Sequence, residues 1–152
     1  MEKFTQTIPD KTAEQIARIQ REVLFEKSDV NSVKSLAESG VLFFVEFDEK
    51  QNVACFCSVK PILDEWEIYD LATVPEHRNR GMAKKIIGEI LDFALKNGAK
   101  KVFLEVRESN NAAINLYSNL GFEKYLTRKN YYKNTQDGVL GAENAVCMRK
   151  VL

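Results

Sequence analysis

Between a predicted strand and the most regular predicted helix, the sequence reads Arg78-Asn79-Arg80-Gly81-Met82-Ala83. A helix start carries several backbone N–H groups without intrahelical partners, and the helix dipole favours negative charge there. Gly81 lets the backbone approach a ligand closely, and the small Ala83 does not block it. The two arginines and Lys84 add positive charge. The segment therefore predicts a diphosphate cradle, although an ordinary helix start with basic neighbours has the same pattern.

Helical and strand patterns extend on both sides of this segment. The predicted helices span Asp10–Phe25 with Asp10 or Thr12 as cap, Asn31–Ser39, Gly81–Asn97, and a segment from a cap at Ser109 or Asn110 through Leu120. The predicted strands span Val41–Phe47, Val53–Val59, Trp66–Val74, Lys101–Arg107, Phe122–Thr127 and Ala145–Val151. The order is roughly β-α-α-β-β-β-α-β-α-β-β. It indicates an α/β fold (a mixed α+β sheet) with helices on both faces, since its first half is too strand-rich for a doubly wound fold.

Length and composition limit the function classes. The 152 residues suit one domain, 1–152, with one core. Lys+Arg and Asp+Glu number 22 each, so no whole-chain charge favours nucleic acid as a direct partner. No apolar run nears 18 residues and Met1–Thr5 has no apolar signal core, so we expect a cytoplasmic protein without a membrane partner. With His77 as the only histidine, the three cysteines are expected to be reduced core thiols rather than metal or redox groups.

Glu105 lies within an apolar strand pattern. The run Lys101–Arg107 alternates, so Glu105 is expected on the face opposite to Val102, Leu104 and Val106. Partial burial raises the pKa of a carboxyl group toward the range in which it works as a general base. A glutamate that simply reaches water near a strand end remains the alternative.

Tyr117 shares a predicted helix face with Asn110 and Ala113, because the three residues are spaced three and four apart. It can be a core tyrosine whose hydroxyl has a partner. It can instead protonate a leaving thiolate.

Two segments resemble a known family. Arg78-x-x-Gly81-x-Ala83 resembles the Gln/Arg-x-x-Gly-x-Gly/Ala signature of the GNAT acetyltransferase superfamily, and Asp70–Pro75 looks like that family's fourth strand. The resemblance implies a GNAT-like fold, a mostly antiparallel sheet splayed in the middle with helices on both faces. It also implies acetyl-CoA as co-substrate, without a metal. The residues that it implies for acetyl-CoA binding are Leu71, Ala72, Thr73, Arg78, Asn79, Arg80, Gly81, Met82, Ala83, Lys84 and Asn110.

The longer string Leu104–Phe122 is similar to the bacterial ribosomal-protein N-terminal-alanine acetyltransferases within the superfamily. This resemblance implies Glu105 as general base and Tyr117 as general acid. Arg128–Tyr132 resembles the peptide-binding edge of that subfamily, which implies Tyr131 and Tyr132 as acceptor-binding residues. By contrast, Leu24–Asp29 stands where the subfamily usually has an aromatic-proline-tryptophan stretch beside the acceptor site, so the acceptor can differ.

The expected reaction is direct acetyl transfer from acetyl-CoA to the N-terminal α-amine of a protein, with a ribosomal protein that begins with alanine as the favoured acceptor. An α-amine has a pKa of about 7.7–8.0 and a lysine about 10.4, so neutral lysine at pH 7 costs about 3.4 kcal/mol more. Two alternatives are an acetyltransferase for a small free amine and a non-catalytic acetyl-CoA sensor. The presence of both Glu105 and Tyr117 argues against the sensor.

Overall fold

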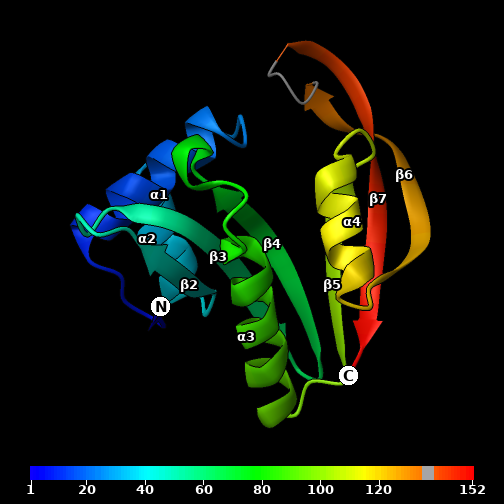
Figure 1. The fold of residues 1–152 in the computed structure, drawn as a ribbon, viewed down its shortest axis with the longest axis horizontal. Coiled ribbons are helices and arrows are strands. Elements are labelled where there is room, and N and C mark those ends of the chain that lie inside the picture. The colour runs from blue at the N-terminus through cyan, green and yellow to red at the C-terminus, as the bar shows by residue number, and fades with distance from the viewer. Residues whose placement is uncertain (135–138) are drawn as a thin grey trace.

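The computed structural model describes residues 1–134 and 139–152, and one sheet organises this part of the chain (Figure 1). Its strands are β1 (Glu2–Phe4), β2 (Leu42–Phe47), β3 (Val53–Ile62), β4 (Glu65–Thr73), β5 (Lys101–Arg107), β6 (Glu123–Asn134) and β7 (Leu140–Val151). Among the described residues these seven strands lie in the order β1-β2-β3-β4-β5-β7-β6. Neighbouring strands are antiparallel except β4 and β5, which are parallel. The predicted mixed sheet and the predicted order of elements are confirmed.

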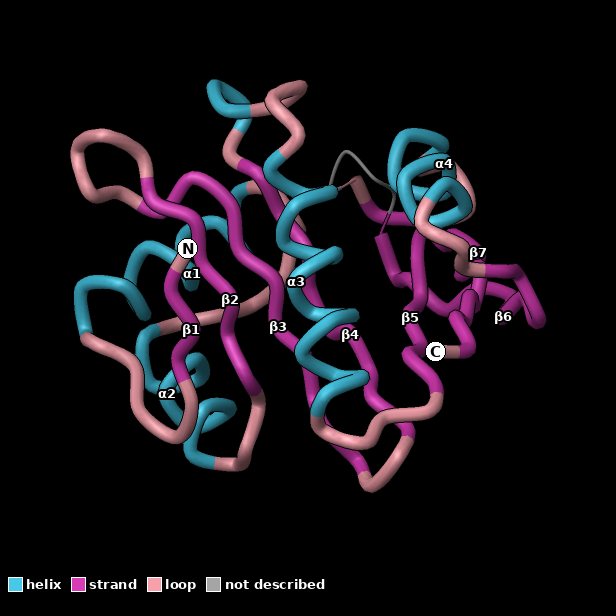
Figure 2. The backbone as a smooth tube through the Cα atoms, turned by 60° about the horizontal axis from the view of Figure 1, so that its bottom comes forward, coloured by secondary structure: helices cyan, strands magenta, loops and turns pink. Residues whose placement is uncertain are grey.

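Helices cover both faces of the sheet, as predicted (Figure 2). They are α1 (Asp10–Glu22), α2 (Val30–Glu38), α3 (Met82–Lys96) and α4 (Asn111–Asn119), with a short 3-10 helix at Pro75–His77. Helices α3 and α4 pack into one apolar cluster with β4, β5 and β7. Helices α1 and α2 pack into a second cluster with β2 and β3 on the opposite face.

The apolar stripe of α3 explains why this helix is well defined. Ile86, Ile87, Ile90 and Ala94 are fully buried, as their helical spacing predicts. Burial of each such isoleucine contributes about 1.5–3 kcal/mol relative to exposure. The three cysteines are also buried and free, as predicted. Burial raises the pKa of the Cys55 thiol to about 11, so this thiol stays protonated at neutral pH.

The sheet opens in its middle because β4 and β5 pair over only part of their length. Glu65–Ile68 of β4 pair with Lys101–Leu104 of β5. In the described part of the chain, no ladder pair joins the continuation Tyr69–Thr73 to Glu105–Arg107. Figure 1 shows the two halves of the sheet meeting at one end and diverging at the other. The diverging edge of β4 presents backbone groups that can pair with an extended ligand.

A bulge in β4 lies at the start of this opening. Ser58 pairs with Asp70 while Val59 pairs with Ile68, so Tyr69 is an extra residue on β4. A bulge changes the direction in which the following side chains point. Here the carboxyl group of Asp70 accepts from Ser58 Oγ at 3.2 Å and from Gln20 Nε2 of α1 at 2.9 Å.

Several predicted boundaries are wrong. Helix α1 ends at Glu22 rather than Phe25, because Phe25 has the left-handed backbone angle φ of 54°. Its N-cap is Pro9, so neither Asp10 nor Thr12 caps the helix. Strand β6 extends beyond Thr127 to Asn134, and β7 begins at Leu140 rather than Ala145. These extra strand segments are mostly exposed, so they lack the apolar pattern on which the prediction rested.

Candidate active site

A cavity of about 580 Å³ lies between the diverging strands β4 and β5. Its lining includes every residue predicted to bind acetyl-CoA, namely Leu71, Ala72, Thr73, Arg78, Asn79, Arg80, Gly81, Met82, Ala83, Lys84 and Asn110. Glu105, Tyr117 and Tyr132 also line it, whereas Tyr131 is outside this lining. The fold therefore brings together residues that are far apart in sequence.

The backbone at the start of α3 is suited to an anion. Gly81 is the N-cap of α3, has the left-handed angle φ of 75° and provides no side-chain cap. Asn79 is also left-handed, with φ of 60°. A Cβ atom at Gly81 would meet no atom within 4 Å, so the space beside this residue is open. The uncapped N–H groups of the first turn, with Arg80 and Lys84 beside them, fit the diphosphate of a coenzyme A ester.

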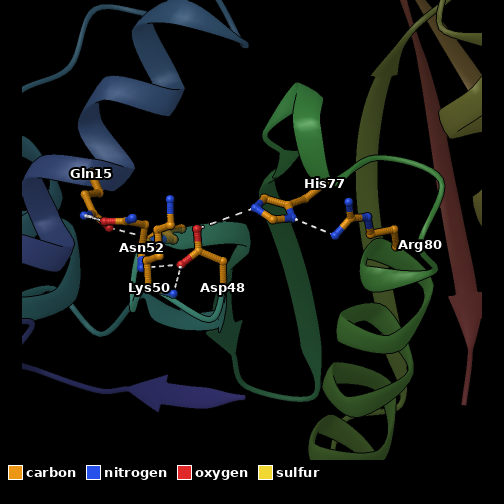
Figure 3. A network of polar contacts seen from close by, with 7 residues as sticks. Gln15, Asp48, Lys50, Asn52, His77 and Arg80 are labelled. Carbon is orange, nitrogen blue, oxygen red and sulfur yellow. Dashed lines mark hydrogen bonds and ion pairs between the residues drawn. The ribbon is translucent and has the colours of Figure 1, made fainter.

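His77 connects this cradle to the β2–β3 turn (Figure 3). Its Nε2 lies 3.5 Å from Asp48 Oδ2, and its Nδ1 lies 3.3 Å from Arg80 Nη1. Backbone N–H groups of Asn52 and Lys50 donate to the Asp48 carboxylate, and they hold its pKa below its usual range. The sequence pattern suggested only a surface loop histidine, because Asp48 is nearly thirty residues away.

Glu105 lies on β5 opposite to the buried Val102, Leu104 and Val106, as the alternation predicts. Arg128 Nε of β6 is 3.2 Å from Glu105 Oε1. The Tyr131 hydroxyl donates to Glu105, which is the main reason that the pKa of Tyr131 is raised. Tyr131 therefore contacts the candidate base from outside the main cavity, and its neighbour Tyr132 faces into the cavity.

Tyr117 projects from α4 toward the same cavity. Its side chain is buried, and its ring meets Phe122 edge-on at 5.7 Å between centroids. Burial raises the pKa of the phenol well above its usual value, so the hydroxyl holds its proton at neutral pH. Asn110 caps α4 by accepting from the Ala113 N–H at 3.1 Å, which confirms the predicted cap.

The sequence profile of the Acetyltransferase (GNAT) family matches residues 9–122. The chain belongs to the GNAT acetyltransferase family. The predicted superfamily and the predicted acyltransferase class are therefore confirmed.

This GNAT acetyltransferase has characterised relatives. It is 34% identical over 119 residues to the ribosomal protein bS18-alanine N-acetyltransferase of Escherichia coli strain K12, over 77% of this chain and 78% of the relative. The crystal structure of the Escherichia coli ribosomal-protein-S18-alanine N-acetyltransferase superposes with a TM-score of 0.83 at 26% identity, over 99% of this chain and 94% of that one. Arabidopsis thaliana NAA60 in complex with acetyl-CoA shares the fold, with a TM-score of 0.80 at 16% identity over 99% and 97% of the two chains.

The cavity lining also carries carboxyl groups from β4 and from the segment after α1. Asp70 is largely buried there, and burial raises the pKa of its carboxyl group. Glu26 follows α1 and lines the same cavity. Partial desolvation by the cavity walls raises the pKa of Glu26 to about 7, although much of its surface is exposed. Repulsion from Asp70 adds to this rise, and attraction to Arg107 opposes it.

Arg107 lines the same cavity and is bonded to the end of β6. Its Nη1 donates to the Asn134 carbonyl at 2.6 Å and its Nη2 donates to Asn134 Oδ1 at 2.8 Å. Its guanidinium carbon also lies 4.2 Å from the centroid of the Tyr132 ring. Asn134 Nδ2 in turn donates to the Phe25 carbonyl at 3.4 Å. The sequence assigned no site role to Glu26 or Arg107 and none at this cavity to Asp70, although Glu26 lies in the atypical segment Leu24–Asp29 and Asp70 begins the segment Asp70–Pro75.

Two further observations concern metals and membranes. Within residues 1–134 and 139–152, no group of three or more His, Cys, Asp or Glu side chains is arranged to hold a metal ion. No helix in the same part of the chain has the length and apolar character needed to cross a membrane.

Proposed function

We propose that this protein transfers the acetyl group of acetyl-CoA to the N-terminal α-amine of a protein, and that the acceptor is a ribosomal protein with an N-terminal alanine. The observation that carries the proposal is the polarity of one cavity, with a cationic cradle at Arg78–Lys84 and carboxyl groups of Glu26, Asp70 and Glu105 elsewhere in the lining. An acyl donor that carries a diphosphate suits the cationic cradle, and an ammonium group suits the carboxyl groups. The 34% identity to a bS18-alanine N-acetyltransferase supports the choice of acceptor.

In this proposal acetyl-CoA binds between the diverging strands. The α3 N-terminus with Arg80 and Lys84 holds the diphosphate, while the free edge of β4 at Leu71–Thr73 pairs with the amide groups of the pantetheine arm. This arrangement directs the thioester toward Glu105 and Tyr117, which line the same cavity. Asn110, at the start of α4, completes the donor side.

The chemistry needs one proton acceptor and one proton donor. Glu105 accepts a proton from the attacking nitrogen, directly or through water, as the C–N bond forms. Tyr117 gives its proton to the sulfur as the C–S bond breaks, because its raised pKa keeps the hydroxyl protonated. The cysteines take no part, since burial raises the pKa of the Cys55 thiol and keeps it in the un-ionised form. Tyr131 and Tyr132 contact the acceptor chain on the β6 side.

Two wider assignments follow from this proposal. Residues 1–152 act as one N-acetyltransferase domain, because the single sheet supplies both walls of the cavity through β4 and β5. The reaction takes place in the cytoplasm, where ribosomal proteins are made, and it needs no direct nucleic-acid or membrane partner.

A coenzyme A release assay tests the function. The acceptor panel contains peptides with free N-terminal alanine, serine or methionine, lysine-bearing peptides with blocked ends, and polyamines. Release is expected with the alanine-ended peptide. Release only with polyamines would identify a small-amine acetyltransferase, and acetyl-CoA binding without release on any acceptor would identify a sensor.

Variants of the two candidate catalytic residues test the assignment of roles. Glu105→Gln and Tyr117→Phe are each expected to lower kcat by roughly a hundredfold, which is the usual scale of general acid–base catalysis. Calorimetry should give an acetyl-CoA affinity close to that of the unchanged protein. Unchanged turnover in both variants would remove these roles from Glu105 and Tyr117.

A further inference from the structure

An acceptor that arrives as an α-ammonium must lose two protons before it becomes an amide. The nitrogen begins with three hydrogens and ends with one. Glu105 accounts for the proton that leaves as the C–N bond forms. The earlier proton, whose removal turns the ammonium into a nucleophilic amine, leaves either for bulk water or for a second acceptor within the cavity.

Glu26 lies in the right part of the molecule for this task. It lines the same cavity as Glu105, but it comes from the segment after α1 rather than from the sheet. The Glu26 N–H donates to the Gln20 carbonyl at 3.0 Å, which fixes the backbone at this residue. Ser28 Oγ donates to Gln20 Oε1 at 2.6 Å, and Arg21 Nη1 donates to the Ser28 carbonyl at 2.8 Å. Glu26 therefore projects from a braced turn and not from a free loop.

The two glutamates differ in their partners. Glu105 is engaged by Arg128 Nε at 3.2 Å and by the Tyr131 hydroxyl, so its position is determined by β6. No hydrogen bond or ion pair to the Glu26 carboxyl group is present among the described residues. Because its surface is partly exposed, Glu26 can also return a proton to water.

Charged groups from several elements face Glu26. Asp70 of β4 repels it, and Arg107 of β5 attracts it. Arg107 donates to Asn134 and forms an ion pair with Glu143 of β7 at 3.4 Å, and no ion pair between Arg107 and Glu26 is present among the described residues. Burial raises the pKa of the Tyr132 hydroxyl, and the negative charges of Glu105 and Glu26 add to this rise. Arg21 of α1 is directed toward the Ser28 carbonyl.

We propose that Glu26 accepts the first proton of the acceptor α-ammonium, while Glu105 accepts the second during attack on the thioester. The step rests on the proposed acetyl transfer and is balanced. One N–H bond breaks and its proton goes to a Glu26 oxygen, leaving the electron pair on nitrogen. That pair forms the C–N bond, the C–S pair leaves with sulfur, and Tyr117 protonates the thiolate. The Glu105 proton restores Tyr117, and the Glu26 proton passes to water.

The raised pKa of Glu26 is matched to an α-amine as the group that gives up the proton. With the pKa of Glu26 near 7, transfer from an α-ammonium of pKa about 7.7–8.0 is unfavourable by roughly tenfold. The same transfer to an ordinary glutamate of pKa about 4.3 would be unfavourable by over a thousandfold, roughly. A lysine acceptor, with a pKa of about 10.4, would again face a barrier of roughly a thousandfold. With Glu26 as acceptor, the transfer is therefore accessible to a chain end and much less so to a lysine side chain, a difference set by the pKa values of the two amines.

The pH dependence of Glu26→Gln tests the proposal with an alanine-ended peptide as acceptor. At pH 7 the variant is expected to lose roughly tenfold to a hundredfold in kcat. The loss should shrink above the acceptor's own pKa of about 8, because the amine then arrives already neutral. Glu26→Asp, which keeps a carboxyl group, should retain most of the activity at pH 7. Glu22→Gln is the matched control, because Glu22 ends α1 but does not line the cavity.

Two results would overturn the role of Glu26. One is a kcat profile of Glu26→Gln that coincides with that of Glu22→Gln. The other is a loss that is equally large at pH 7 and pH 9.5, since a purely structural defect would not be repaired by a neutral acceptor. Failure of the proposed function is separate, because the unchanged protein would then release no coenzyme A with this peptide at any pH.

Discussion

Arg128 Nε on β6 lies 3.2 Å from Glu105 Oε1 on β5, although β7 separates the two strands in the sheet. Arg128 pairs with Ala145 of β7, two residues from Cys147, which pairs with Glu105, so its long side chain reaches across β7. Cys147 of β7 also lies close, with Sγ 3.9 Å from the same oxygen. The carboxyl group proposed as the base is therefore oriented by side chains from two other strands.

Arg128→Met should reduce turnover by roughly tenfold, because a misplaced catalytic group loses much of its effect. Acetyl-CoA affinity should change little, since Arg128 does not line the main cavity. Steady-state kinetics with the alanine-ended peptide would measure this effect. Lys129→Met removes a neighbouring exposed charge and serves as the control. Equal turnover in the two variants would mean that the ion pair does not orient Glu105.

Gly81→Ala should weaken both folding and donor binding. The left-handed φ of 75° costs an alanine about 1 kcal/mol, which corresponds to about 2–4 °C in Tm for a chain of this size. The new methyl group has open space beside it in the free protein, but that space is where the diphosphate is proposed to bind. The KM for acetyl-CoA should therefore rise, by about tenfold.

Gly88→Ala provides the control for this change within the same helix. Gly88 lies inside α3 and has no positive φ, and a Cβ atom there would also meet nothing within 4 Å. Alanine is the better helix former by about 1 kcal/mol, so this variant should be slightly stabilised. Thermal unfolding of the two variants should thus shift in opposite directions, and a shift in the same direction would contradict the backbone argument.

Asp48→Asn should raise the KM for acetyl-CoA by about threefold while leaving kcat nearly unchanged. His77 lies between Asp48 and Arg80, so loss of the carboxylate charge is expected to release His77 and then Arg80 from its position beside the cradle. Acetyl-pantetheine, which has no diphosphate, should be used equally well by the variant and the unchanged protein. Glu49→Gln, at the adjacent position of the turn, is the control. An equal loss with acetyl-pantetheine would show a general defect of the fold instead.

Local periodicity explains what the sequence predicted correctly. The spacing of Ile86, Ile87 and Ile90 defined α3, and alternation in β5 placed Glu105 on the correct face. Glu26 and Asp70 were not recognised, because they meet only after α1 packs against the sheet and the bulge at Tyr69 reorients β4. The outer part of β6 was missed for a related reason, since an exposed strand needs no apolar alternation.

Glu26→Gln should make the protein more resistant to unfolding, and increasingly so as the pH rises. The folded pKa of about 7 lies above the value of about 4.3 expected for an unfolded glutamate. Between these values the folded state binds more protons, so its stability falls as the pH rises through this window and does not recover above it. Glutamine carries no such cost. The Tm of the variant minus that of the unchanged protein should therefore be larger at pH 8.5 than at pH 5, whereas Glu22→Gln should show no comparable trend. A difference that stays constant between the two pH values would mean that the folded cavity does not raise the pKa of Glu26, and it would remove the electrostatic support for its role as proton acceptor.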